Sequence, residues 1–306
     1  MADGYPRARV LAAFAAVYLV WGSTYLAIKY AVQTIPPFLM VGTRFATSGG
    51  LLYVWARWRG APQPTRRQWR DAAIAGALML CCGNGAVSWA EQRVPSGLAA
   101  LLVASVPLWI VIVDWMRPDG TRPTIGIMLG VVTGLAGLII LVGPATLAGH
   151  GTIDSAAAIV LIGGSLAWAA GSVYNRHGSR PRSAALSTGI QMIGGSVALF
   201  VLAAFSGEVR GFRPSAIAAV SIAGWLYLVT FGSLVGFTAY IYLLQAVTPA
   251  KASTYAYVNP LIAVFLGWAF AGEPVTVRTL AAAAIILGGV AMITLAQTRS
   301  GRSRSS

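Results

Sequence analysis

The sequence predicts an all-α polytopic membrane protein with ten transmembrane helices, arranged as two inverted five-helix repeats. Three observations lead to this fold class. Of the 306 residues, 57% are hydrophobic and only 10% are charged, whereas a soluble domain carries about 25% charged residues. Apolar runs of about 20 residues, the length that crosses a bilayer as a helix, recur along the whole chain. A pattern in the first half also returns in the second half.

Short polar gaps, many of which contain proline, separate the apolar runs. The predicted spans are residues 10–31, 37–57, 70–90, 95–116, 124–143, 154–175, 183–205, 215–244, 250–271 and 276–297.

Four residues of the first half recur at a single offset of 153 residues. The matched pairs are Gln92 and Gln245, Val94 and Val247, Pro107 and Pro260, and Trp115 and Trp268. Such self-similarity indicates an internal duplication. It predicts one repeat at 10–143 and a second at 154–297, joined by a linker at 144–153 and flanked by tails at 1–9 and 298–306. Five spans per repeat force the second copy to enter the membrane upside down, a plan that places the site of many secondary transporters near the midplane between the halves.

The net charge of +14 is explained by orientation in the membrane rather than by nucleic-acid binding. If the N-terminus is cytoplasmic, 16 Lys and Arg residues fall on the cytoplasmic side and 5 on the outer side. This asymmetry follows the positive-inside rule. We therefore expect a multi-pass protein of the inner (plasma) membrane, surrounded by lipid, with both termini in the cytoplasm.

Several motifs stand in a characteristic order: VWGSTY at 20–25, GTRF at 42–45, SVPL at 105–108, and NPLIAVFLGW at 259–268 followed by GEP at 272–274. In their order, spacing and duplication these motifs resemble the EamA-type members of the drug/metabolite transporter superfamily, over about residues 10–297. The resemblance implies ten helices, two inverted repeats, cytoplasmic ends, and export or exchange of small metabolites. In one place the chain departs from the family, because residues 117–120 read RPDG where Gly-Glu is usual.

Arg44 is the main candidate for contact with a solute. It lies about seven residues inside its span, and a charge at that depth marks a functional site by default. It would bind an anion or a carboxylate in a cavity. The alternative is a helix-packing arginine bonded to carbonyls or to a nearby carboxylate.

Other polar, aromatic and proline residues complete the candidate site. Polar positions predicted to contact the solute are Asn84, Gln92, Gln245, Tyr255 and Asn259, and the aromatic walls are Trp21, Tyr25, Trp89 and Trp168. The alternative for the polar set is interhelical hydrogen bonding. Pro107 and Pro260 each fall inside a span, where a proline removes a backbone hydrogen bond, so both are predicted hinges.

Carboxylates look scarce inside the spans. Asp114 lies near a span end, where we expect it to pair with Arg117; proton coupling through a pKa raised by desolvation is the alternative. Glu91 and Glu273 lie at span ends and are expected to be interfacial. This scarcity argues against a proton-driven pump and leaves facilitated transport or exchange open.

Together these features predict a transporter of small organic metabolites or drugs, such as amino-acid-like or amphipathic solutes, that exports them by alternating access. An integral-membrane enzyme is a weaker alternative, because His150 and His177 are isolated in loops; a lipid-linked sugar flippase is another. No metal or cofactor is expected. Small residues spaced four apart at Gly126, Gly130 and Gly134 suit close helix packing, with a homodimer as their alternative use.

Overall fold

The computed structural model describes residues 6–118, 120, 122–142, 154–247 and 255–302, and every secondary-structure element in these ranges is helical. The elements are α1 (Arg7–Ala31), α2 (Pro37–Trp58), α3 (Arg66–Gly76), η1 (Ala77–Asn84), α4 (Gly85–Ala90), α5 (Ser96–Val103), α6 (Val106–Trp115), α7 (Ile125–Val142), α9 (Ser155–His177), α10 (Ala184–Phe205), α11 (Glu208–Gly211), η2 (Pro214–Ala216), α12 (Ala219–Tyr227), η3 (Leu228–Val235), α13 (Gly236–Ala246), α15 (Tyr255–Ala271) and α16 (Val277–Arg302).

Local sequence signals explain where several helices begin. α2 begins at Pro37, whose fixed φ angle and missing N–H suit a first helical turn. Before α3, the Thr65 hydroxyl accepts from the backbone N–H of Gln68, and the Gln68 side chain accepts from the N–H of Thr65, which forms a capping box. Asp154 and Ser183 cap α9 and α10 by accepting a backbone N–H three residues further on.

Eight of the described helices are long and apolar enough to cross a membrane, and they fall on eight of the ten predicted spans. The other two predicted spans, 37–57 and 250–271, fall on α2 and α15. α2 has 22 residues but carries Arg44 and Arg57, and α15 has 17 described residues because 248–254 lie outside the described ranges. The described residues therefore contain eight candidate spans, and the count of ten stays a prediction.

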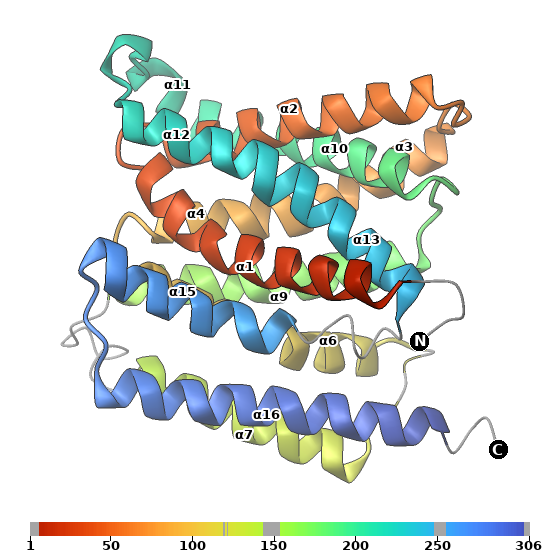
Figure 1. Ribbon diagram of the computed structural model, residues 1–306, viewed down its shortest axis with the longest axis vertical. Coiled ribbons are helices and arrows are strands. Elements are labelled where there is room, and N and C mark those ends of the chain that lie inside the picture. The colour runs from red at the N-terminus through yellow and green to blue at the C-terminus, as the bar shows by residue number, and fades with distance from the viewer. Residues whose placement is uncertain (1–5, 119, 121, 143–153, 248–254, 303–306) are drawn as a thin grey trace.

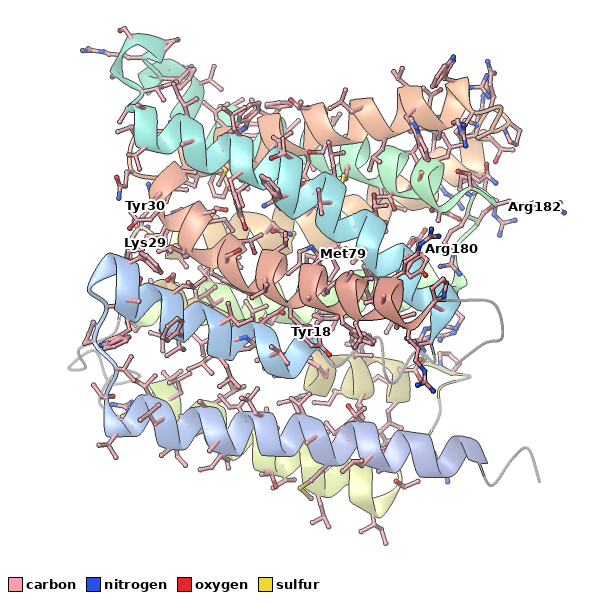
Figure 2. The ribbon with its side chains drawn as sticks, viewed as in Figure 1. Tyr18, Lys29, Tyr30, Met79, Arg180 and Arg182 are labelled. Atoms are coloured by element: carbon pink, nitrogen blue, oxygen red, sulfur yellow. The ribbon has the colours of Figure 1, made fainter. Side chains whose placement is uncertain are left out.

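The helices lie roughly side by side, and their connections gather at two ends (Figure 1). The start of α1, the end of α16 and the α2–α3 and α9–α10 connections lie at one end. The end of α1, α11 and the α15–α16 connection lie at the other. Figure 2 accordingly shows Arg180 and Arg182 far from Lys29 and Tyr30. This separation matches the predicted split between cytoplasmic and outer segments, although which end faces the cytoplasm remains a prediction.

Both halves of the chain contain an eight-residue π-helical segment within a longer helix. η1 follows α3 and continues into α4, and η3 follows α12 and continues into α13, with starts 151 residues apart. π-helical turns are rare and are frequently found at functional sites. The duplication seen in the sequence therefore extends to an unusual backbone feature that side-chain patterns did not predict.

Contacts between helices are reciprocal between the halves. α2 packs on α10 and α7 packs on α16, so each pair joins one helix from each half. α1 packs on α12, η3, α13 and α15, while α9 packs on α3, η1, α4, α5 and α6. Exchanging the halves converts one set of contacts into the other, as a two-fold relation between them would require. The inverted orientation itself remains a prediction.

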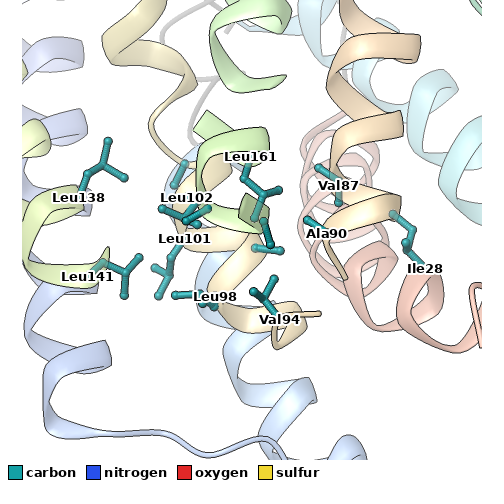
Figure 3. Close-up of a cluster of buried hydrophobic side chains, with 14 of the residues drawn as sticks. Ile28, Val87, Ala90, Val94, Leu98, Leu101, Leu102, Leu138, Leu141 and Leu161 are labelled. Atoms are coloured by element: carbon teal, nitrogen blue, oxygen red, sulfur yellow. The ribbon is translucent and has the colours of Figure 1, made fainter. Parts of the chain in front are cut away.

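The main apolar core lies where α1, α4, α5, α7 and α9 meet (Figure 3). Leu101, Leu102 and Leu161 are fully buried there. Because lipid is as apolar as leucine, such a core is held by close packing more than by removal of apolar surface from water. The precise fit of small residues therefore matters more here than in a soluble domain.

α7 and α16 approach each other closely through glycines. A Cβ atom on Gly289 would lie 2.6 Å from the backbone nitrogen of Gly134 and 2.7 Å from the carbonyl oxygen of Gly130. The glycine stripe of α7 thus packs against a helix of the same chain. A homodimer stays a prediction, without support from this stripe.

Gly289→Ala should lower the thermal unfolding temperature of the detergent-purified protein, because the added methyl group meets backbone atoms, and overpacking typically costs about 1–3 kcal/mol. Gly288→Ala is the matched control, since a Cβ atom there meets nothing within 4 Å and alanine favours the helix. Equal unfolding temperatures for the two variants would contradict the close α7–α16 contact.

Candidate functional site

Arg44 is buried in α2, and its side chain reaches the π-helical segment η3. Only 5% of the residue is exposed. Its Nε donates to the Ser233 hydroxyl at 3.0 Å, and its guanidinium lies 4.8 Å from the centroid of the Phe45 ring. Its Nη1 is buried and makes no hydrogen bond. The predicted intramembrane arginine is therefore inside the bundle with one donor group unused.

Trp21 meets the same π-helical segment from α1. Its Nε1 donates to the carbonyl oxygen of Gly232 at 3.1 Å. Its ring packs against Tyr240 and Tyr255, with centroids 5.2 and 5.0 Å away, and the two tyrosine rings lie 5.6 Å apart. Arg44 reaches the same glycine, because a Cβ atom on Gly232 would lie 3.1 Å from Arg44 Nη2. Two predicted site residues, Trp21 and Tyr255, thus form an aromatic cluster next to Arg44.

Asn259 is buried in α15 and ties that helix to α1. Its side-chain nitrogen donates to the carbonyl oxygens of Tyr18 at 3.3 Å and Tyr255 at 3.2 Å. The bond to Tyr18 of α1 is interhelical hydrogen bonding, the alternative to contact with a solute. Tyr25, one helical turn beyond Trp21, packs against the main apolar core.

The second half repeats this arrangement with different chemistry. Trp168 of α9 packs on Gly83 of η1, where a Cβ atom would lie 2.8 Å from Cε3 of the indole. Gln191, at the position matching Arg44, donates from Nε2 to the sulfur of Met79 at 3.2 Å, and Met79 lies midway along the helices (Figure 2). Asn84 is half-buried at the end of η1. Each predicted tryptophan therefore covers the π-helical segment that lies in the other half.

A cavity of about 400 Å³ lies at the end of the bundle where α1 leads into α2. Trp89 and Gln92 line it, together with Phe38, Ser206 and Glu208. The structure thus brings two predicted site residues to a separate place from the aromatic cluster.

The cavity and Arg44 lie at different depths along α2. Pro37, at the cavity wall, precedes Arg44 by seven residues, or about 10 Å of helix. Gln92 lies beyond α4, which ends at Ala90, so it is not on the same helix as the residues that follow Asn84.

The two predicted hinge prolines differ in their backbone surroundings. α5 ends at Val103, and Pro107 stands in the first turn of the new helix α6, so this span is broken. Pro260 lies inside α15, which continues unbroken. A hinge role for either proline stays a prediction. The side chain of Gln245 lies outside the described part of the chain.

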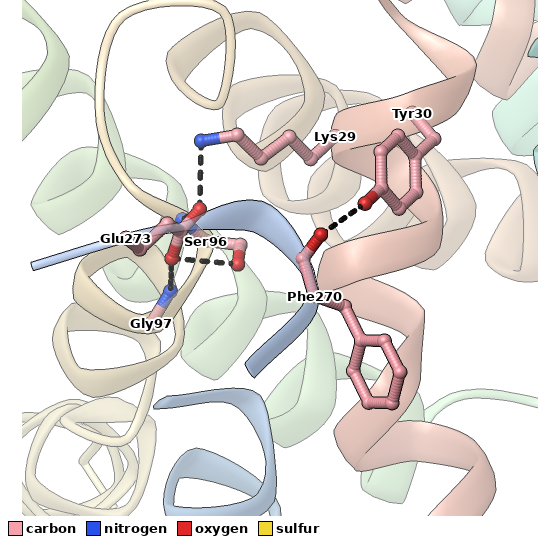
Figure 4. A network of polar contacts seen from close by, with 6 residues as sticks. All are labelled: Lys29, Tyr30, Ser96, Gly97, Phe270 and Glu273. Carbon is pink, nitrogen blue, oxygen red and sulfur yellow. Dashed lines mark hydrogen bonds and ion pairs between the residues drawn. The ribbon is translucent and has the colours of Figure 1, made fainter. Parts of the chain in front are cut away.

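Sequence reasoning missed a buried charged network (Figure 4). Glu273 was expected at the interface but is only 6% exposed. It accepts from Lys29 Nζ at 2.7 Å, from the N–H and the hydroxyl of Ser96 at 2.7 and 3.0 Å, and from the N–H of Gly97 at 3.1 Å. Burial alone would raise the pKa of Glu273, but Lys29 and the N–H donors outweigh it, so its pKa lies below the ordinary value.

Glu91 was also expected to be interfacial and is instead 3% exposed. It follows the last residue of α4, and both of its carboxylate oxygens are buried without a hydrogen bond. Burial, and next the charge of Glu273, raise the pKa of Glu91 well above the ordinary value, and Lys29 offsets them only in part. One signal could have found this cluster, because Lys29, Glu91 and Glu273 all fall on the predicted outer side.

Asp114 behaves as predicted: its carboxylate pairs with Arg117 at 3.2 Å. Of the carboxylates considered from the sequence, two of the three were therefore misplaced. Both errors came from treating a helix end as equivalent to the membrane surface.

A model of the EamA-like transporter family matches the chain twice, over residues 8–143 and 155–295. The chain belongs to the EamA-like transporter family. The resemblance seen in the motifs is thereby confirmed. Together with its apolar helices, this membership makes the chain a multi-pass membrane transporter rather than an enzyme.

Relatives of this EamA-like chain carry matching descriptions. The uncharacterized inner membrane transporter YedA of Escherichia coli K12 is 38% identical over 284 residues, covering 92% of this chain and 89% of that protein. A probable terminal-alkyne amino-acid exporter of Streptantibioticus cattleyicolor is 25% identical over 280 residues and covers 90% of each chain. A crystal structure with 20% identity covers 94% of this chain and 97% of its own, with a TM-score of 0.57, and shows that the fold is shared. The location is the inner membrane, as for YedA.

Glu273→Ala should lower the free energy of unfolding by about 3–5 kcal/mol, because it leaves the Lys29 cation without its buried partner. Glu208→Ala is the matched control: Glu208 also accepts backbone N–H groups at a helix start, those of Phe38 and Leu39, but has no ion pair among the described residues. Loss of such a cap typically costs about 0.5–2 kcal/mol. Thermal unfolding in detergent would measure both, and equal losses would contradict a structural role for the ion pair.

Proposed function

We propose that the chain exports small organic solutes that carry a carboxylate and an apolar or aromatic body, of the amino-acid-like class, by alternating access. One observation carries this proposal: a buried arginine with an unused donor, Nη1 of Arg44, next to the aromatic cluster around Trp21. A guanidinium binds a carboxylate through paired N–H donors. Aromatic walls with a few oriented polar groups suit the rest of such a solute.

Relatives support the direction and the solute class. A relative named as a probable terminal-alkyne amino-acid exporter aligns with nine-tenths of this chain. The substrate in its name, a terminal-alkyne amino acid, combines an amino-acid head with an apolar tail, which is the chemistry that Arg44 and the aromatic cluster would bind. The cavity lined by Trp89 and Gln92 would be the route by which a solute leaves at the outer end.

Movement would come from the two halves, which we propose to be inverted five-helix repeats at 10–143 and 154–297. The π-helical segments η1 and η3 each lie against a tryptophan from the other half. A rearrangement of one segment would therefore move residues in both halves. The break before Pro107 supplies one place where a helix can bend without losing further hydrogen bonds.

We also propose that both termini lie in the cytoplasm, on the strength of the basic residues that gather at that end. Reporter fusions after Pro62 and after His150 should then report cytoplasm and exterior, respectively. A reporter such as alkaline phosphatase, active only outside, should work at the second position alone. Activity at the first position alone would overturn the proposed orientation.

Arg44→Gln should reduce transport of a carboxylate-bearing solute in proteoliposomes at least tenfold, since removal of a buried charge-assisted contact costs about 1.5–3 kcal/mol. Gln191→Ala, at the matching position of the other half, is the control and should leave recognition of the carboxylate intact. Thermal unfolding would confirm that each variant is folded.

Matched ligands sharpen this test. Tyrosine and phenylalanine should raise the unfolding temperature of the wild-type protein more than tyramine and phenethylamine, which lack the carboxylate. The difference should disappear in Arg44→Gln. If it persists, Arg44 is a packing residue and the carboxylate is recognised elsewhere.

A further inference from the structure

The joint between α4 and α5 holds a carboxylate that the proposed solute path does not use. Glu91 is buried, and neither of its oxygens has a hydrogen-bond partner. An ionised carboxylate in such a place is strongly disfavoured unless it is paired, so it is held as the neutral acid. The structure therefore shows a proton-binding group at the end of a helix.

The neighbouring charges explain why Glu91 is left unpaired. The ionisable groups that interact with it are Lys29 and Tyr25 of α1 and Glu273 of the α15–α16 connection. Lys29 is the only cation of this set, and its ammonium lies 2.7 Å from Glu273. Glu273 also takes the donors at Ser96 and Gly97, which lead into α5. One cation thus interacts with two carboxylates and is bound to only one of them.

Helices α2 and α9, which also pack on α4, bring no competing partner from their buried polar groups. Arg44 of α2 donates to Ser233, and the buried hydroxyls of Ser48 in α2 and Ser165 in α9 donate to backbone carbonyls of their own helices. The ionised form of Glu91 would therefore require water, or a move of Lys29 away from Glu273. Either change would disturb the packing of α1, α4 and α5.

Glu91 is close in the chain to the wall of the cavity. Trp89 and Gln92, two residues before it and one after, both line that cavity. Opening of this end of the bundle would bring water to the joint at these positions. Opening would hydrate Glu91, and its proton would pass to that water.

We propose that Glu91 is a proton-operated latch: the protonated carboxyl closes this end of the bundle, and its ionisation favours the open form. The proposal rests on the proposed function only in treating that opening as a step of alternating access. The protons balance, since closing transfers one proton from water to a carboxylate oxygen of Glu91 and opening returns that proton to water. Because the closed form binds the proton more tightly, low pH favours closure, and opening becomes easier as pH rises through the closed-state pKa.

Thiol labelling of the full-length protein tests the latch without any solute. In a background of Cys81→Ala and Cys82→Ala, a cysteine at Ala90 is buried when the end is closed, since Ala90 is 0% exposed. A cysteine at the exposed Gln92 is the reference, because it corrects for the effect of pH on maleimide chemistry. The measured quantity is the ratio of the two labelling rates between pH 5 and 9.

With Glu91 present, the ratio should rise by up to tenfold per pH unit between the open-state pKa and the closed-state pKa, where opening releases a single proton, and level off above the closed-state pKa. In Glu91→Gln, a neutral residue of the same shape, the ratio should be low and independent of pH. In Glu91→Ala the ratio of labelling rates should also be independent of pH, which excludes an effect specific to the glutamine side chain. A flat ratio with Glu91 present, or the same slope in both variants, would overturn the latch. Because no solute is used, the labelling result can be interpreted even if the proposed transport function is wrong.

Discussion

The Glu273 carboxylate constrains more of this molecule than any other single group. It receives the ammonium of α1 and the first N–H groups of α5, while it stands between α15 and α16. Three segments distant in sequence therefore meet at one anion. The approach is close enough that a side chain on Gly267 would collide with the carboxylate. Away from water, every charge of this network needs its partner, because loss of a partner destabilises the fold far more for a buried charge than for a surface charge.

A second constraint is the close approach of helices across the two halves. α7 meets α16 through glycines, and each π-helical segment presents a glycine to a tryptophan of the other half. Where lipid removes the hydrophobic driving force between helices, contact area and hydrogen bonds determine association. Small residues are therefore concentrated where the halves touch, while larger apolar side chains such as Ile139 and Leu295 face outward.

The sequence predicted those features that depend only on the length of apolar segments. The hydrophobic length located eight candidate spans. The sequence did not predict burial that depends on which distant segments lie close together in the fold. Glu91 and Glu273 follow the ends of apolar runs, so their sequence neighbours indicate an interface. Only the fold shows that Lys29, 62 residues before Glu91, covers this end of the bundle. The π-helical segments were equally hidden, because their residues are as apolar as those of an ordinary span.

The repeat is symmetric in backbone and unequal in chemistry. Arg44 has a matching glutamine, Gln191, and the break before Pro107 has an unbroken counterpart at Pro260. Residues 117–120 lack the Gly-Glu pair that supplies Glu273 in the second half. If the halves were chemically identical, the two faces of the bundle would be equivalent, and neither would have a preferred response to solute or pH. Unequal side chains on a duplicated backbone therefore give each end of the molecule its own set of charged groups, such as Lys29, Glu91 and Glu273 at one end.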